Sequence, residues 1–208
     1  MDKYDVEIMV VERALLFPDH EGHFEGFRPH PEVNYEERVL EHNKFLRRGD
    51  VEEDPSYKQP IAYVLIVNPR LRKVFAYQRK KADPRLQGKW SWGIGGHVER
   101  VDTGHPIHTS RDREIGEEIE IDGEIGEPKF MGYIYTEKDP VGRVHFGLLY
   151  IIETNAEIVR HRSEEIGQGG LRSVIDLGSF TQDPGVEVEE WSKIALQPLR
   201  DYFARLDA

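Results

Sequence analysis

The segment VGRVHFGLLYIIET, residues 141–154, constrains the fold of this chain more than any other, because apolar residues fill most of it. A half-buried strand alternates apolar and polar residues, whereas a strand buried on both faces carries a nearly continuous apolar run. The run is also shorter than the roughly 20 residues that a helix needs to span a bilayer. The segment therefore predicts a central strand in a sheet that other layers cover.

Other predicted strands and helices alternate along the chain. Strands are predicted at residues 5–17, 61–69, 73–79, 128–137 and 171–177, with a short strand at 90–98 and a turn at 68–71 that makes 61–79 a hairpin. Helices are predicted at 34–49, 107–120 and 186–206. Asn34 should cap the first of these helices, Gly49 should end it, and Pro198 should kink or restart the last. This alternation favours an α/β chain with a mixed sheet between helical layers.

Composition excludes several classes of function. The chain has 208 residues, a formal net charge of -11 and no cysteine. Broad electrostatic binding to a nucleic-acid polymer or an anionic membrane needs a basic face, so neither is expected as a partner. Disulfides and thiolate metal sites are excluded. The opening residues MDKYDVEIMVVERALLF lack the basic-then-apolar order of a signal peptide, so a cytoplasmic protein is expected.

An acidic cluster follows two glycines in GGHVERVDTGHPIHTSRDREIGEEIEI, residues 95–121. Glu114, Glu117 and Glu118 stand at i, i+3 and i+4, so a helix would project all three carboxylates to one side. Like charges so placed repel, and Mg²⁺ or Mn²⁺ would offset that repulsion, since both prefer hard oxygen ligands. Arg113 has a planar fork that can hold one carboxylate and fix its direction. A solvated acidic helix face would explain the glutamates but neither the glycines nor the arginine.

This stretch resembles the Nudix box of the Nudix hydrolase superfamily, in which Gly, five residues, Glu and seven residues precede Arg-Glu-U-x-Glu-Glu-x-Gly-U, where U is bulky and aliphatic. Gly96 matches the first glycine, and residues 113–121 match the second half. The chain departs from the pattern in four ways: Ile94 replaces a common proline, Asp102 or Glu99 stands for the first glutamate, three residues are inserted before Arg113, and Glu120 replaces a glycine. The likeness covers about residues 60–200, so we expect a Nudix domain at 61–208 with residues 1–60 as an N-terminal extension packed on it.

The resemblance implies an α/β/α sandwich and the hydrolysis of a diphosphate linked to another group. It implies that the Gly96 carbonyl, Glu114, Glu117 and Glu118 hold Mg²⁺, with Mn²⁺ as an alternative, and that Arg113 orients one of these glutamates. The general base varies in the family between a box glutamate and a loop acid. Glu164 and Glu165 follow the predicted central strand in RHRSEEIGQGG, and Glu165 is the candidate, although a solvated loop explains both equally well.

The expected partner is a small diphosphate substrate, namely a derivative of a nucleoside diphosphate. Arg79 and Lys89 precede the box in a basic segment that could meet phosphates, while Trp92 and His97 are candidates for contacts to the rest of the substrate. For any one of these cations surface charge is the commoner explanation. Trp92 belongs with Trp90, Tyr133, Tyr135 and Phe146 to a set of strand aromatics that are more often core than stacking platforms.

Two rival functions remain at this point. The segment QRKKADPRLQGKWSWGIGGHV is similar to a run in isopentenyl-diphosphate isomerase, but that enzyme uses an active-site cysteine and this chain has none. A Nudix domain can also bind a nucleotide without cleaving it, as a sensor, although such domains usually lose box glutamates.

The N-terminal strand at 5–17 could join the chain's own sheet or pair with a second copy in a two-fold homodimer.

Overall fold

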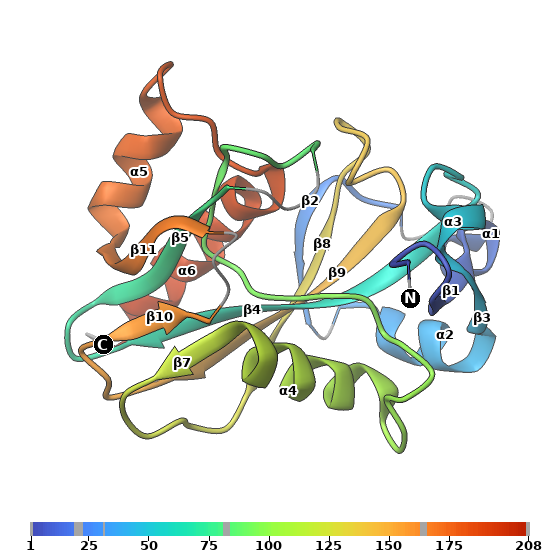
Figure 1. Ribbon diagram of the computed structural model, residues 1–208, viewed down its shortest axis with the longest axis horizontal. Helices are drawn as coiled ribbons and strands as arrows, with labels where there is room; N and C mark the ends of the chain where they lie inside the picture. Colours follow the sequence, from blue (N-terminus) through green and yellow to red (C-terminus); the bar gives the residue numbers. More distant parts are fainter. Residues whose placement is uncertain (1, 19–22, 31, 81–83, 163–165, 207–208) are drawn as a thin grey trace. The chain divides into compact units, whose positions relative to one another are not determined.

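The computed structural model describes residues 2–18, 23–30, 32–80, 84–162 and 166–206. Figure 1 follows the elements from the N-terminus in blue to the C-terminus in red. The chain forms two compact units: Met1–Tyr63, Gly95–Glu114 and Met131–Leu149 make the first, and Val64–Ile94, Ile115–Phe130 and Tyr150–Ala208 make the second.

The first unit contains the N-terminal strands. Strand β1 (Glu7–Glu12) pairs antiparallel with β3 (Lys44–Arg47) and then with the start of β4 (Tyr57–Asn68), while β2 (Gly26–Pro29) pairs antiparallel with β8 (Lys129–Tyr135). Helices α1 (Arg13–Leu16), α2 (Tyr35–His42) and α3 (Arg48–Val51) lie here, and α4 (Pro106–Glu118) begins here. The core is an aromatic cluster in which Phe17, Phe24, Tyr35, Tyr133, Tyr135 and Phe146 are buried. The strand aromatics of this unit are therefore core residues.

The second unit is built on β5 (Lys73–Arg79). This strand pairs antiparallel with β4, with β6 (Trp90–Ser91) and with β11 (Ile166–Ser173), and a smaller sheet pairs β7 (Ile119–Ile121) with β10 (Val159–His161). Helices α5 (Val174–Gln182) and α6 (Glu190–Arg205) belong to this unit. Helix α6 buries its apolar side, including Trp191, Leu199, Tyr202 and Phe203.

The expected α/β architecture with a mixed sheet is confirmed. Strand β9 (His145–Glu153) is the predicted central strand, and its first eight residues are all buried. The amide of Gln59 donates to Val144 O at 2.7 Å, and the amide of Thr154 donates to Val67 O at 2.8 Å, so β4 and β9 run in the same direction. Since the other pairings above are antiparallel, the sheet is mixed.

The predicted helix at 34–49 is wrong in its second half. Asn34 caps α2 by accepting from the Glu37 amide at 3.1 Å, as expected, but the helix ends at His42. Lys44–Arg47 becomes β3 because these residues supply the hydrogen bonds that the outer edge of β1 needs. In the same way residues 13–16 of the predicted N-terminal strand form α1. Tertiary pairing outweighs local periodicity in both places.

One C-terminal strand prediction also needs correction. The strand predicted at 171–177 ends at Ser173, because Ser173 and Asp176 form a reciprocal capping box that starts α5 at Val174. Pro198 lies inside α6 and does not divide it into two helices. In contrast, the four positions predicted to be buried in α4 and just beyond it are buried: Ile107, Ser110, Ile115 and Ile119.

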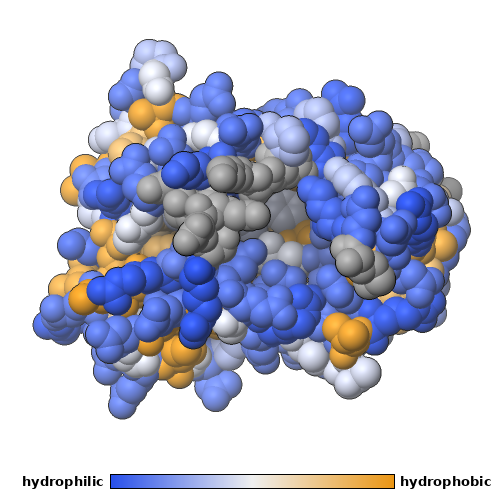
Figure 2. Space-filling model, in the orientation of Figure 1, coloured by the Kyte–Doolittle hydropathy of each residue, from blue (hydrophilic) through white to orange (hydrophobic). Residues whose placement is uncertain are grey.

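The N-terminal strand lies in the chain's own sheet through β3 and β4, which is one of the two arrangements that the sequence left open. The homodimer and the domain boundary near residue 60 stay predictions. The face in Figure 2 is mostly hydrophilic, and the large exposed apolar side chains of the described residues come from separate elements: Tyr4, Leu15, Val101, Ile125, Ile158, Ile175 and Leu206. No helix in the described ranges is long and apolar enough to cross a membrane.

Candidate metal and catalytic site

Helix α4 carries the three predicted metal ligands. It spans Pro106–Glu118, so Glu114, Glu117 and Glu118 all fall in its last turns at i, i+3 and i+4. Glu114 is half-buried, Glu117 is exposed and Glu118 is half-buried. The helix ends at Glu118 and β7 begins at Ile119, so Glu120 is a strand residue. Glu120, where the family has glycine, thus comes after the helix and leaves the three ligands on it.

Gly96 makes room for the Glu114 carboxylate. A methyl group at Gly96 would overlap the Cδ and both carboxylate oxygens of Glu114. The neighbouring Gly95 answers a different need, since a methyl group there would overlap the carbonyl oxygen of Ala62 in β4. The two glycines therefore have separate roles. Gly95 lets the chain approach β4, and Gly96 leaves space for the carboxylate of a predicted metal ligand.

Arg113 holds Glu114 in that position, as predicted. Its Nη1 donates to Glu114 Oε1 at 2.6 Å and its Nη2 donates to the carbonyl oxygen of His97 at 3.0 Å. The guanidinium also binds Asp102 through both carboxylate oxygens, at 2.9 and 3.0 Å. The hydrogen bonds to Asp102, followed by the charge of Glu114, raise the pKa of Arg113 above its ordinary value. The arginine is therefore a permanent cation fixed between two carboxylates.

Asp102 is the residue that takes the place of the family's first glutamate. Its side chain is 1% exposed and accepts the Glu99 amide at 2.8 Å besides both bonds from Arg113. The sequence left Asp102 and Glu99 as alternatives, and the pairing with Arg113 decides for Asp102. A shorter acid, with five residues between it and Gly96, reaches the arginine because the chain turns back on itself at 99–102.

Replacing Asp102 by asparagine is expected to lower the free energy of unfolding by about 3 kcal/mol, because it leaves the partly buried Arg113 charge without its main partner. Glu99→Gln is the control, and we expect it to change stability by less than about 0.5 kcal/mol. Urea denaturation followed by circular dichroism measures both. Equal stability of the two variants would show that the Asp102–Arg113 pair contributes nothing to the fold.

His97, a predicted substrate contact, lies next to the seat of Glu114. Its Nε2 is 2.6 Å from Gln59 Oε1 and 3.2 Å from His145 Nε2. His145 Nδ1 donates to the carbonyl oxygen of Val141 at 2.7 Å, and Gln59 Oε1 can only accept, so the Nε2 proton of His97 is directed at Gln59, the nearer neighbour. The Nε2 of His97 thus faces Gln59 and His145, so a substrate would contact a different part of the imidazole ring.

In the second unit, Glu118 lies beside His161. His161 Nε2 is 3.5 Å from Glu118 Oε2, and the Arg162 amide donates to the Glu118 carbonyl oxygen at 2.7 Å. His161 is itself packed against the Tyr77 ring, with centroids 5.5 Å apart. Sequence reasoning missed His161, because a lone histidine in a polar segment carries no pattern. His145 was also missed, although a histidine in the central apolar strand is a signal for a buried polar contact.

Two of the predicted substrate cations lie together in the second unit. The Arg79 amide donates to the Lys89 carbonyl oxygen at 3.0 Å, and Arg79 lines a hollow of about 490 Å³ with Gln78, Lys80, Gln87, Gly88 and Gln168. The Arg79 guanidinium lies 5.3 Å from the centre of the Tyr77 ring. The hollow thus has two cations in its lining, Arg79 and Lys80, and Arg79 Nη2 also lies 4.0 Å from Glu189 Oε2.

Trp92, a predicted substrate contact, is a buried residue of the second unit. Trp92 is 1% exposed, and its backbone amide donates to Ser192 Oγ at 3.0 Å. Its ring has no open face for stacking, so Trp92 is a core residue and not a substrate contact. Glu165, with Glu164, lies outside the described residues, and its role as general base stays a prediction.

Comparisons with known proteins address the family of the chain. No protein-family model matches the chain. It is 31% identical to protein YmaB of Bacillus subtilis (strain 168) over 215 residues, which cover 96% of this chain and 100% of YmaB. Among solved structures, Tm1382, a candidate Nudix hydrolase, is 29% identical, with a TM-score of 0.75 over 94% of this chain and 99% of Tm1382.

A more distant solved structure, the Nudix domain of NrtR from Shewanella oneidensis in complex with ADP-ribose, shares the fold. It is 10% identical, with a TM-score of 0.55 over 70% of this chain and 88% of that domain. The mixed sheet with its helices is the Nudix α/β/α sandwich, and the chain belongs to the Nudix hydrolase superfamily. Within it, this chain is similar to YmaB and Tm1382 over nearly the whole length of each.

Proposed function

We propose that this protein is a Mg²⁺-dependent hydrolase that cleaves the diphosphate linkage of a nucleoside diphosphate derivative, with Mn²⁺ as an alternative ion. The main observation behind the proposal is the position of Glu114. Gly96 leaves the space for its carboxylate, and Arg113 holds that carboxylate by a hydrogen bond. A solvated acidic helix face would require neither feature. Glu117 and Glu118 follow on the same helix with the spacing that a shared ion needs.

Each of the predicted site residues would have its own role in the reaction. Glu114, Glu117 and Glu118, with the Gly96 carbonyl, would hold Mg²⁺. The bound ion would neutralise charge on the diphosphate and make water a better nucleophile. Arg113 is already engaged with Asp102 and Glu114, so its task is to position the ligand and not to touch substrate. Arg79 and Lys89 would bind a phosphate or its leaving group, and Glu165 is the candidate general base.

A substrate screen tests the proposal. Nucleoside triphosphates, dinucleoside polyphosphates, nucleotide sugars, coenzymes and ADP-ribose are incubated with the protein and Mg²⁺, and released phosphate and nucleoside monophosphate are measured. ADP-ribose is included because the NrtR domain binds it. We expect release that EDTA abolishes and that rises above neutral pH. If no member of the panel is cleaved while one binds tightly, the protein is a nucleotide sensor.

A further inference from the structure

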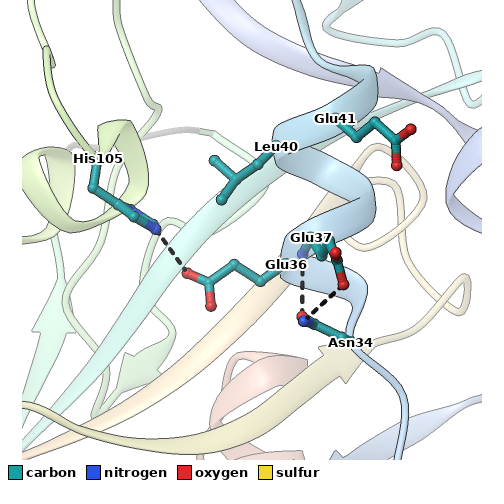
Figure 3. Close-up of a pocket in the computed structure, with 6 residues that line it drawn as sticks. All are labelled: Asn34, Glu36, Glu37, Leu40, Glu41 and His105. Carbon is teal, nitrogen blue, oxygen red and sulfur yellow. Dashed lines mark hydrogen bonds and ion pairs between the residues drawn. The ribbon is translucent and has the colours of Figure 1, made fainter.

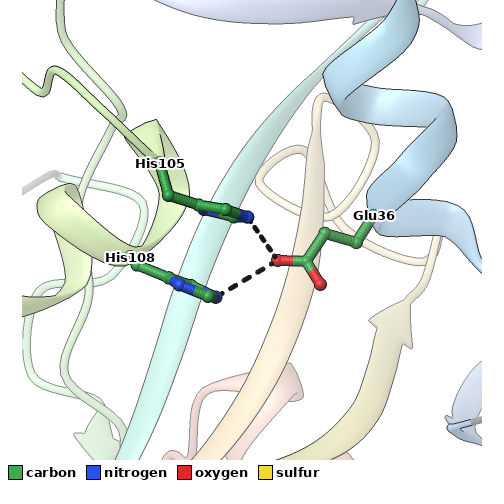
Figure 4. Close-up of side chains that lie close together, drawn as sticks. All are labelled: Glu36, His105 and His108. Carbon is green, nitrogen blue, oxygen red and sulfur yellow. Dashed lines mark ion pairs between the residues drawn. The ribbon is translucent and has the colours of Figure 1, made fainter.

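Three side chains of the first unit, which the proposed hydrolysis does not use, converge on one point. Glu36 comes from the first turn of α2, His105 immediately precedes α4 and His108 lies in its first turn. Figure 4 shows both imidazole rings directing a nitrogen at the same carboxylate oxygen of Glu36. His105 belongs to the segment between Asp102 and Arg113, which is three residues longer than the Nudix pattern. The cluster therefore joins the enlarged loop to the N-terminal part of the chain.

The distances in this cluster are those of ligands around an ion. His105 Nε2 lies 3.8 Å and His108 Nε2 lies 3.5 Å from Glu36 Oε1, and the three ligand atoms lie within 4.8 Å of one another. An N–H···O hydrogen bond is about 2.9 Å long, so these contacts are too long to be good direct bonds. Two ligands on a tetrahedral Zn²⁺ at roughly 2.05 Å from each are about 3.3 Å apart. The two histidine-to-glutamate contacts would each need to shorten by a few tenths of an ångström to match this spacing.

The two imidazole rings of the cluster lie against each other. The His105 and His108 rings stack with centroids 3.7 Å apart and planes 14° from parallel. Both rings are partly exposed, at 39% and 42%, so they can tilt toward a common ion.

A hollow next to the cluster leaves room for a further ligand. It measures about 580 Å³ and is lined by Asn34, Glu36, Glu37, Leu40, Glu41 and His105. Figure 3 shows Glu36 and His105 meeting across it, while Glu37 is held by Asn34 at the start of α2. Three protein ligands with one position open to solvent are typical of an exchangeable metal site.

We propose that Glu36, His105 and His108 bind a divalent transition-metal ion such as Zn²⁺, at a site separate from the carboxylates of α4. Nitrogen ligands favour this class of ion over Mg²⁺, which prefers oxygen. Among the described residues His105 Nδ1 is buried and has no hydrogen-bond partner. A metal-binding histidine usually donates its second N–H, so the lack of that partner is expected to weaken the binding of the ion. The ion would tie α2 to the loop that leads from Asp102 to α4.

Calorimetric titration of Zn²⁺ into the full chain in excess Mg²⁺ tests this site. We expect one Zn²⁺ step in the wild type, weakened at least about tenfold in His108→Gln and in Glu36→Gln. His42→Gln is the matched control, because His42 is also a partly exposed histidine near a glutamate, 3.8 Å from Glu41. His42→Gln and Glu117→Gln should keep the step. Equal affinity in all variants, or loss in the His42 control, would overturn the proposal.

A second measurement needs no variant of the cluster. Diethylpyrocarbonate modifies accessible imidazoles, and mass spectrometry locates the modified residues. Zn²⁺ should protect His105 and His108 in the wild type while His42 reacts at an unchanged rate. If Zn²⁺ leaves the modification of His105 and His108 unchanged, these histidines do not bind it. Thermal unfolding in EDTA should be the same for the wild type and the variants, which shows that any loss of binding is local.

Discussion

Replacing Glu117 by glutamine is expected to lower the rate of Mg²⁺-dependent hydrolysis about a thousandfold, once the screen has identified a substrate. A metal ion at a phosphoryl centre contributes several kcal/mol, and about 4 kcal/mol corresponds to three powers of ten in rate. Glu117 is exposed on α4, so its replacement should change the free energy of unfolding by less than about 0.5 kcal/mol. Initial rates and calorimetric Mg²⁺ titration measure the two consequences, and both should weaken together.

Gly116→Ala is the matched control for Glu117→Gln. Gly116 is the preceding residue in α4, and a methyl group there meets no atom within 4 Å. Alanine favours a helix over glycine, so this variant should gain up to about 1 kcal/mol of stability and keep its activity. Full activity of Glu117→Gln would remove this carboxylate from the metal site. A loss of activity in Gly116→Ala equal to that in Glu117→Gln would show that the helix, and not the carboxylate, is what the reaction needs.

Substitution of the two adjacent glycines should have different effects: a change at Gly96 should lower activity, and a change at Gly95 should lower stability. Gly96→Ala is expected to lower activity about a hundredfold with little effect on unfolding, because the new methyl group displaces the Glu114 carboxylate, which is the end of a flexible side chain. The displaced carboxylate loses its bond from Arg113 Nη1, and the loss of one positioned metal ligand is worth about 2.7 kcal/mol at this rate ratio.

Gly95→Ala should have the opposite profile. Its methyl group would overlap the backbone carbonyl oxygen of Ala62 and lie 3.0 Å from Ile61 Cγ2, and a buried strand cannot move aside as a side chain can. Overpacking of this kind costs about 1–3 kcal/mol of stability. Urea denaturation and initial rates on both variants provide the comparison. If Gly96→Ala keeps wild-type activity, the position of Glu114 does not matter for the reaction.

Local sequence patterns correctly predicted the parts of the fold in which each residue type favours a single structure. The apolar run at 145–153 became a buried strand, Asn34 capped α2, and the glutamates at 114, 117 and 118 fell on one helix. In these places propensity, burial and spacing all favour the same structure. The sequence predicted less well where a segment's partner lies far along the chain. Lys44–Arg47 has a helical pattern, but β1 needs a neighbour, and its hydrogen bonds outweigh a preference worth tenths of a kcal/mol per residue.

The same division holds for the site. By itself the sequence determined the candidate metal ligands and the arginine beside them, because those roles depend on residues a few positions apart on one helix. Only the tertiary structure decided that Asp102 and not Glu99 binds Arg113, that Trp92 is core, and that Glu36 meets His105 and His108. These outcomes depend on which backbone turns bring distant side chains within a few ångströms. Spacing along a chain carries that information only within one helix or strand, where the geometry repeats.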